Sequence, residues 1–193
     1  MITAHNLSKR FGTKRVFERV DIALVTGDSL LVTGPNGSGK TTLLRMLAGL
    51  DAPTSGELLL PDRGLVGYLG HEPLVYRELT PLENLHMFGR LYRIPERGER
   101  IGMLLERFGL WDVRDQRVST FSRGMRHRLG LCRVLLHEPE LVILDEPFNA
   151  LDDAGSTLLD ATLEELHGTR AFVVATHDPA RVERLATQRL AFS

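Results

Sequence analysis

The sequence predicts an α/β fold that begins with an antiparallel β segment and carries an inserted helical segment. Short apolar runs bounded by glycine and proline alternate with longer helical patterns, which is typical of parallel strands joined by helices. The N-terminal runs are instead separated by short polar or glycine-containing breaks, which favours antiparallel pairing. Between Thr80 and His137 the pattern is almost wholly helical, with no strand between successive helices.

Strands are expected at the apolar runs. The antiparallel opening is assigned to residues 2–7, 16–24 and 30–33, and later strands are expected at residues 57–60, 66–69, 141–145 and 171–175, with a last strand-like stretch close to Ser193. A helix is expected at residues 41–50, and Asp178-Pro179 is expected to open a late helix.

The helical segment begins at a recognisable cap. Thr80, Pro81 and Glu83 supply an N-cap, a proline at the first helical position and a glutamate at N3, which together form a capping box. A second helix is expected at about residues 97–108 and a third after Ser122. The third helix carries one predicted apolar face, made of Met125, Leu129, Cys132 and Leu136. We therefore expect one domain over residues 1–193, with an α/β core in 1–79 and 138–193 and a helical subdomain in 80–137.

Composition excludes several classes of protein. The chain has 193 residues, 42% of them hydrophobic, which suffices for one domain with a sizeable core. Its 24 basic and 25 acidic residues nearly cancel, so binding to nucleic acid through bulk charge is not expected. Cys132 is the only cysteine, which excludes an internal disulfide and a multi-cysteine zinc site and fits a reducing compartment.

The apolar runs are far shorter than the roughly 18 residues needed to cross a bilayer. The first residues show neither a charged start nor a long apolar region, so no secretory signal is expected. We therefore expect a cytoplasmic protein without direct membrane insertion, whose membrane role would depend on a partner.

A phosphate-binding loop follows the strand expected at 30–33 and precedes the helix expected at 41–50. Residues 34–41 match the pattern G-x-x-x-x-G-K-[ST]. The glycines let backbone N–H groups turn toward phosphates at a helix N-terminus, which favours anions. Lys40 would bridge the β- and γ-phosphates, and the Thr41 hydroxyl would ligate Mg²⁺. The residues expected to contact the nucleotide are Gly34, Pro35, Asn36, Gly37, Ser38, Gly39, Lys40, Thr41 and Thr42.

The apolar run at residues 141–144 ends in two carboxylates, which form a second half of the same predicted site. Asp145 would hold Mg²⁺ through water. Glu146 points to the other side of the strand end, where it could polarise an attacking water. The alternative, a strand that ends in a solvated acidic turn, is weaker beside a phosphate-binding loop.

At this point the sequence resembles the ATP-binding cassette family, the motor subunits of ABC transporters. Phe121-Ser122-Arg123-Gly124-Met125 stands where the family carries its signature loop, about 20 residues before the carboxylate pair. The resemblance implies a P-loop NTPase core of the RecA-like type and a dimer, homodimeric or pseudo-symmetric, that sandwiches two ATP molecules. Ser122 and Gly124 would then bind the γ-phosphate held by the other cassette, whereas Arg123 and Met125 depart from the commonest letters.

Three further positions complete the resemblance. Residues 149–152, ending in Asp152, look like the D-loop that links the two sites of a dimer. His177, after the strand expected at 171–175, looks like the switch histidine that contacts the γ-phosphate and positions water. Phe11 stands where the family stacks an aromatic ring on adenine. The alternative for His177 is a surface or capping residue, and the alternative for Phe11 is a residue in the core of the first sheet.

The segment after the strand expected at 66–69 departs from the family pattern. There the family places a glutamine that reaches Mg²⁺ and the catalytic water, in a loop that contacts the transmembrane subunit, and His71 falls on that position. Because Mg²⁺ prefers oxygen ligands, imidazole is a poor direct substitute. Contact through water is the preferred interpretation, and a one-residue shift that uses Glu72 is the alternative.

The leading functional hypothesis is an ATPase that drives a separate transmembrane permease from the inner face of the cell membrane. Gly70-His71 and the run 145–152 also resemble the cytochrome c maturation ATPases, which are haem exporters, although exporters of other cargo such as drugs or lipids share several of these features. A second hypothesis is a soluble cassette that works in cofactor assembly without a permease. A third, a poorly hydrolysing regulatory cassette, is motivated by His71 and Arg123.

The basic residues are unevenly divided, since lysine occurs only at Lys9, Lys14 and Lys40 and the other 21 of 24 are arginine. A compact ammonium on a flexible stem fits between phosphates, whereas a planar guanidinium would crowd a glycine-lined loop. This explains Lys40 but leaves Lys9 and Lys14, close to Phe11, without a role.

Overall fold

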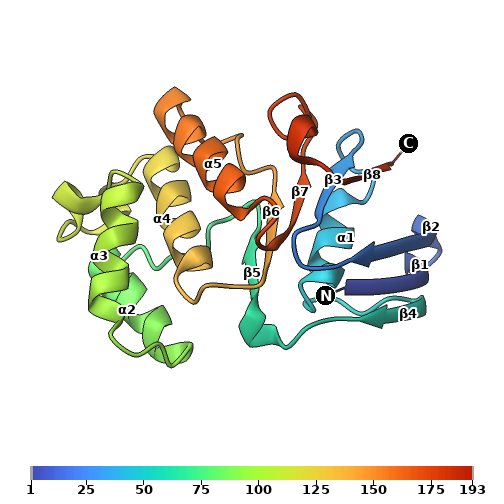
Figure 1. Ribbon diagram of the computed structural model, residues 1–193, viewed down its shortest axis with the longest axis horizontal. Helices are drawn as coiled ribbons and strands as arrows, with labels where there is room; N and C mark the ends of the chain where they lie inside the picture. The colour runs from blue at the N-terminus through green and yellow to red at the C-terminus, as the bar shows by residue number, and fades with distance from the viewer. Residues whose placement is uncertain (1, 193) are drawn as a thin grey trace.

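A computed structural model describes residues 2–192 and contains two sheets with helices between and beside them (Figure 1). The larger sheet is parallel and has the strand order β5-β6-β7-β3-β8. Its strands are β3 (Ser29–Thr33), β5 (Val66–Leu69), β6 (Leu141–Asp145), β7 (Ala171–Ala175) and β8 (Gln188–Ala191). The smaller sheet is antiparallel, with the order β2 (Lys14–Leu24), β1 (Ile2–Phe11) and β4 (Ser55–Leu59).

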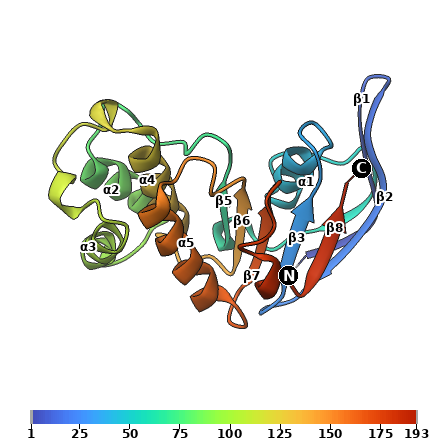
Figure 2. The ribbon, with the colours of Figure 1, turned by 90° about the horizontal axis from the view of Figure 1, so that it is seen from above.

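The parallel sheet separates two hydrophobic cores, because successive side chains of a strand point to opposite faces. Leu141 and Ile143 of β6 pack with helix α1 (Lys40–Leu47) and the antiparallel sheet. Val142 and Leu144 pack on the other face, with α4 (Arg123–Leu135) and α5 (Asp153–Leu166). Viewed from above, α1 lies between the two sheets, and the β1–β2 hairpin stands beside it (Figure 2).

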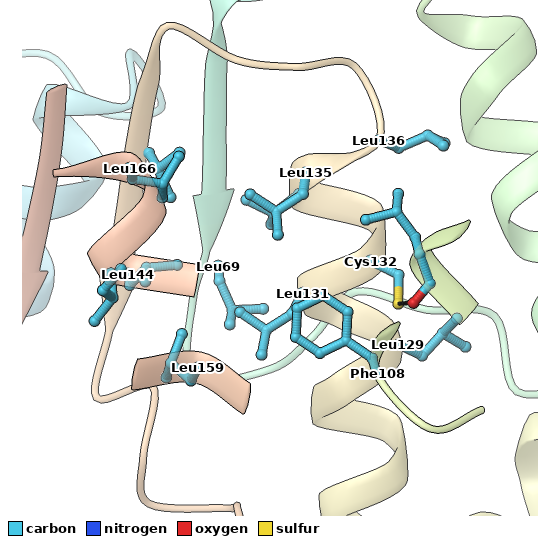
Figure 3. Packing of buried hydrophobic residues seen from close by; sticks show 14 of the residues in the cluster. Leu69, Phe108, Leu129, Leu131, Cys132, Leu135, Leu136, Leu144, Leu159 and Leu166 are labelled. Atoms are coloured by element: carbon cyan, nitrogen blue, oxygen red, sulfur yellow. Dashed lines mark hydrogen bonds between the residues drawn. The ribbon is translucent and has the colours of Figure 1, made fainter. Parts of the chain in front are cut away.

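Helices α2 (Pro81–Leu91), α3 (Arg97–Arg107) and α4 lie together at the end of the molecule away from the antiparallel sheet (Figure 1). The capping box at Thr80 and Glu83 is present as predicted. Leu129, Leu131 and Phe108 pack closely in the shared core (Figure 3). Buried Cys132 belongs to the same cluster, and its thiol donates to the backbone oxygen of Leu104 at 3.5 Å.

Two expectations about the strands are wrong. Strand β3 does not join the antiparallel opening but lies between β7 and β8, because its residues 29–32 are buried on both faces, as in a central parallel strand. Strand β4, expected among the later strands and not in the antiparallel opening, pairs antiparallel with β1 and is mostly exposed, which suits a sheet edge.

The prediction of a late helix after Asp178-Pro179 is also wrong, because this segment forms turns and a short 3₁₀ helix (Glu183–Leu185). Val182 and Leu185 are buried in the core, and the Ser29 hydroxyl donates to the Leu185 carbonyl, so tertiary contacts shape this connection. Helix α5 was not anticipated, although its N-cap Asp152 accepts a hydrogen bond from Gly155 N at 2.8 Å. No helix among residues 2–192 is both long and apolar enough to cross a membrane.

Candidate active site

The predicted phosphate loop joins β3 to α1 and has the backbone of an anion site. Gly34, Gly37 and Gly39 have φ values of +144°, +81° and +110°, a region that other residues rarely adopt. A Cβ on Gly39 would stand 2.7 Å from Val16 of β2. Among the residues that the structure describes, no side chain caps the first turn of α1, which leaves this turn open to bind an anion.

Lys40 is buried at the start of α1, with 6% of its surface exposed. Its ammonium donates to the carbonyls of Gly34 at 2.7 Å and Pro35 at 3.2 Å. It also lies 3.6 Å from Oε1 of Glu146. A buried cation next to free helix N–H groups can bind phosphate strongly once it leaves these internal acceptors.

Asp145, at the end of β6, meets the loop through Thr41, whose hydroxyl donates to Asp145 Oδ2 at 2.7 Å. Burial raises the pKa of the Asp145 carboxyl, the Thr41 bond opposes that shift, and the charge of Glu146 adds to it. Oδ1 of Asp145 is buried and has no hydrogen-bond partner among residues 2–192. An unpartnered buried carboxylate oxygen next to a threonine hydroxyl is a suitable donor pair for a hard cation.

Glu146 follows in a left-handed backbone conformation, with φ +49°. Its N–H donates to the Ala175 carbonyl at 2.8 Å, which fixes it against the end of β7. Its Oε2 accepts hydrogen bonds from His177 Nδ1 at 2.8 Å and His177 N at 3.3 Å. Strained backbone of this kind concentrates at functional sites, and here it holds a carboxylate where it can accept a proton.

A cavity of about 630 Å³ lies over these residues. It is lined by Phe11, Lys14, Arg15, Val16, Asn36, Gly37, Ser38, Gly39, Lys40, Thr41, Thr42, His71, Asp145, Glu146 and Asn149. Phe11 is 56% exposed, so it is not a residue of the first sheet's core. His71 is exposed where the loop after β5 borders the cavity. Gly34, Pro35 and His177 are predicted site residues that are not part of this lining. The carbonyls of Gly34 and Pro35 accept from Lys40, and His177 is bonded to Glu146.

Four lining residues were not assigned to the site from the sequence: Lys14, Arg15, Val16 and Asn149. The first three begin β2, where Lys14 pairs with Phe11 across the hairpin. Only the pairing of the two strands brings this part of β2 to the phosphate loop, although the short break between Phe11 and Lys14 was a signal for a tight hairpin.

Ser122, Gly124 and Asp152 lie outside the cavity. Ser122 caps α4 by accepting from Met125 N at 3.2 Å, as predicted, and Asp152 caps α5. A Cβ on Gly124 would stand 3.0 Å from the Ala150 carbonyl, so the start of α4 packs against the segment before α5. Within one copy of the chain these residues do not reach the phosphate loop.

A family model described as ABC transporter matches residues 17–149. The chain belongs to the ABC transporter family. This match covers the phosphate loop, the carboxylate pair and the loop before α4, and it confirms the resemblance seen in the sequence.

Curated relatives from the ABC family fall in several groups. The uncharacterised ABC transporter ATP-binding protein YxlF of Bacillus subtilis is 37% identical over 97% of this chain and 66% of its own length. A cytochrome c biogenesis ATP-binding export protein CcmA of Pseudomonas syringae pv. tomato is 42% identical over 83% of this chain and 80% of its own length. The chain spans slightly less than two thirds of YxlF and 62% of the related YdbJ from Bacillus subtilis.

Solved ABC structures share the whole fold. An ATP-binding subunit of an ABC transporter superposes with a TM-score of 0.92 at 27% identity, over 100% of this chain and 85% of that one. A dimeric post-hydrolysis state of the ATP-binding cassette MJ0796, bound to ADP and Pi, gives a TM-score of 0.89 at 25% identity over 100% and 94% of the two chains. These structures confirm the predicted P-loop NTPase core with its antiparallel and helical additions.

Proposed function

We propose that this chain binds and hydrolyses ATP as the motor subunit of an ABC transporter. The observation that carries the proposal is the convergence of Lys40, Thr41, Asp145 and Glu146 on one cavity at the carboxyl ends of β3 and β6, with His177 after β7 bonded to Glu146. Ligands of parallel α/β sheets bind at this edge.

Binding would change the partners of Lys40. With ATP in the cavity, the ammonium moves from the Gly34 and Pro35 carbonyls to the β- and γ-phosphate oxygens, and the N–H groups of residues 36–42 surround the phosphates. Thr41 and Asp145 would hold Mg²⁺, to which the unpartnered Oδ1 of Asp145 is suited. The ion would neutralise charge that develops on the phosphates.

Hydrolysis would use Glu146 as the proton acceptor. A water attacks the γ-phosphorus, its proton passes to Glu146, and the bond to the leaving ADP oxygen breaks. His177 Nδ1 holds the carboxylate in place at 2.8 Å. His71, at the border of the cavity, would contact water in the site through its imidazole. This is the role that we propose for it in place of the glutamine amide that the family carries at this position.

Phe11 would stack on the base, since its ring is exposed on the wall of the cavity nearest the β1–β2 turn. Stacking reads a π-face with little discrimination between bases, so weak preference for ATP over GTP is expected.

Two copies would complete the site. Ser122, Gly124 and Asp152 lie away from the chain's own phosphate loop, and Ser122 is exposed where it caps the start of α4. Placed against a second cassette, this helix start would donate N–H groups to the partner's γ-phosphate. In this proposal, residues 80–137 form the subdomain that carries Ser122, and ATP closes a homodimer or pseudo-symmetric dimer.

The chain would act on the inner face of the membrane, through contact with transmembrane permease subunits. For the transport process we propose export in cytochrome c biogenesis, because three CcmA proteins are 42%, 39% and 37% identical to this chain. A drug exporter is the second candidate, since the daunorubicin resistance protein DrrA3 of Streptomyces coeruleorubidus is 36% identical.

Phosphate release from ATP by the purified chain tests the proposed activity. We expect Mg²⁺-dependent release that Thr41→Ala reduces and that the exposed-site control Thr13→Ala does not. Release that is equal in wild type and Thr41→Ala would contradict the assignment. Purification from detergent extracts, with identification of the membrane subunit that accompanies the chain, tests the partner and the cargo; a soluble partner alone would contradict the transport role.

A further inference from the structure

The two lysines without a role in the phosphate loop lie at one end of the β1–β2 hairpin. Lys9 belongs to β1, and Lys14 opens β2, where it pairs with Phe11. Lysine is rare in this chain, with three residues against 21 arginines. Lys9 is half-buried, so its side chain contacts other residues, and these contacts can explain why a lysine stands at this position.

Lys9 contacts the exposed ring of Phe11. Its ammonium lies 4.9 Å from the centroid of that ring, within the range of a cation–π contact. Lys9 and Phe11 are two residues apart on β1, and this contact places their side chains on the same side of the strand. The ammonium therefore lies over one face of the ring, and Phe11 lines the cavity whereas Lys9 is not among its lining residues.

The same ammonium fixes the hairpin to the segment after α1. It donates to the Ala52 carbonyl at 2.6 Å. Two further bonds join this segment to β1, from Thr54 N to Ser8 O at 2.9 Å and from Arg10 N to Thr54 Oγ1 at 3.0 Å. Because α1 begins in the phosphate loop, Lys9 links the ring of Phe11 to the helix that holds the phosphates.

We propose that Lys9 is a positioning residue for the nucleobase, holding the Phe11 ring at a set place relative to the phosphate loop so that a purine stacks on its free face. This inference rests on the proposed function, in which Phe11 stacks on the base of ATP. A compact ammonium can donate to a carbonyl and face a ring at once, whereas a guanidinium is planar and directs its donors in a fork.

Calorimetric titration with two ligands tests the proposal. One is the imido analogue of ATP, which is not hydrolysed, and the other is inorganic tripolyphosphate, which carries phosphates but no base, each with Mg²⁺. Lys9→Met keeps the length of the stem and removes the charge. We expect it to weaken binding of the analogue about two- to fivefold and to leave tripolyphosphate binding unchanged.

Controls separate the possible causes. Arg10→Met removes a neighbouring cation that pairs with Glu18, so both affinities should match the wild type. Phe11→Ala should weaken the analogue alone, and adding Lys9→Met to it should cause no further loss.

Three results would overturn the proposal. If Lys9→Met weakens both ligands equally, Lys9 acts through general charge or folding. If Phe11→Ala weakens the analogue and Lys9→Met does not, the base contact stands and the role of Lys9 is wrong. If Phe11→Ala has no effect, the proposed base contact fails, and the inference fails with it.

Discussion

His177 Nδ1 lies 2.8 Å from Oε2 of Glu146, so the residue after β6 and the segment after β7 are joined by their side chains. The His177 side chain is 55% exposed, whereas that of Glu146 is 10% exposed. The buried carboxylate is therefore oriented from the solvent side by a histidine that is free to contact a ligand.

Removal of His177 should impair turnover more than binding. His177→Ala leaves Glu146 at the strand end but removes the partner that orients it. We expect kcat for ATP to fall by about 10²-fold or more with a small change in KM, because ground-state contacts of the phosphates remain. Steady-state phosphate release measures both constants. Turnover equal to that of the wild type would remove His177 from the site.

The role of His71 can be separated from that of a bystander. If His71 acts through water, His71→Gln should retain turnover within about threefold, because an amide also binds water, and His71→Ala should lose about fivefold, a typical value for one hydrogen bond. Steady-state ATPase assays measure both variants. A large gain in His71→Gln would show that the histidine restrains the site, and no loss in His71→Ala would make it a bystander.

Much of the site was predictable because its motifs are local. The phosphate loop needs glycine, lysine and threonine at fixed positions between a strand and a helix, and the structure has that arrangement around Lys40. The Asp145 side chain could be placed at the same edge because parallel strands end together. These inferences depend only on residues close in sequence and on the direction of the strands.

The rest depends on long-range pairing. Which sheet β3 and β4 join depends on the strands that they pair with. A short apolar run in the sequence does not specify its partner strand. Arg15 and Val16 reach the cavity only through the pairing of β1 with β2. The connection after β7 has the proline of a helix start, but burial of Leu185 and its bond to Ser29 determine its path.

Stability at acid pH should depend on His127. This residue of α4 is 3% exposed, and burial lowers its pKa from 6.5 to about 4. The unfolded chain therefore binds more protons than the folded chain between these values, so His127 lowers stability as the pH falls through 6.5 toward 4. From about pH 7.5 to about pH 5 the loss is about 2 kcal/mol.

Urea unfolding of the wild type and of His127→Leu across this range measures the effect. The variant should show a smaller loss of stability on acidification. The exposed His167 offers a matched control, since His167→Leu should keep the pH dependence of the wild type. Parallel curves for the wild type and His127→Leu would contradict the assignment.

Arg133 should matter for stability without touching the cavity. It is 7% exposed, and it donates to the carbonyls of Tyr68 at 2.8 Å and Pro73 at 3.2 Å. Its guanidinium also lies over the ring of Phe88 at 5.5 Å. Arg133 thus connects α4 to both ends of the loop that carries His71.

Replacement by methionine removes the side-chain donors to both carbonyls, so we expect Arg133→Met to lower the free energy of unfolding by about 2–4 kcal/mol. Arg90→Met, at an exposed position of α2, should change it by no more than about 0.5 kcal/mol. Equal effects of the two substitutions would show that the Arg133 bonds do not stabilise the fold.

The central claim is that Glu146 accepts the proton of the attacking water in a site completed by a second cassette. Glu146→Gln keeps the shape of the side chain and removes its basicity. The most direct measurement combines phosphate release with the mass of the chain in solution, determined by light scattering in the presence of ATP and Mg²⁺. We predict that Glu146→Gln loses at least about 10²-fold in release and accumulates as an ATP-bound dimer, whereas Glu146→Gln with Lys40→Ala stays monomeric. Undiminished release by Glu146→Gln, or a mass that ATP leaves unchanged, would contradict the account.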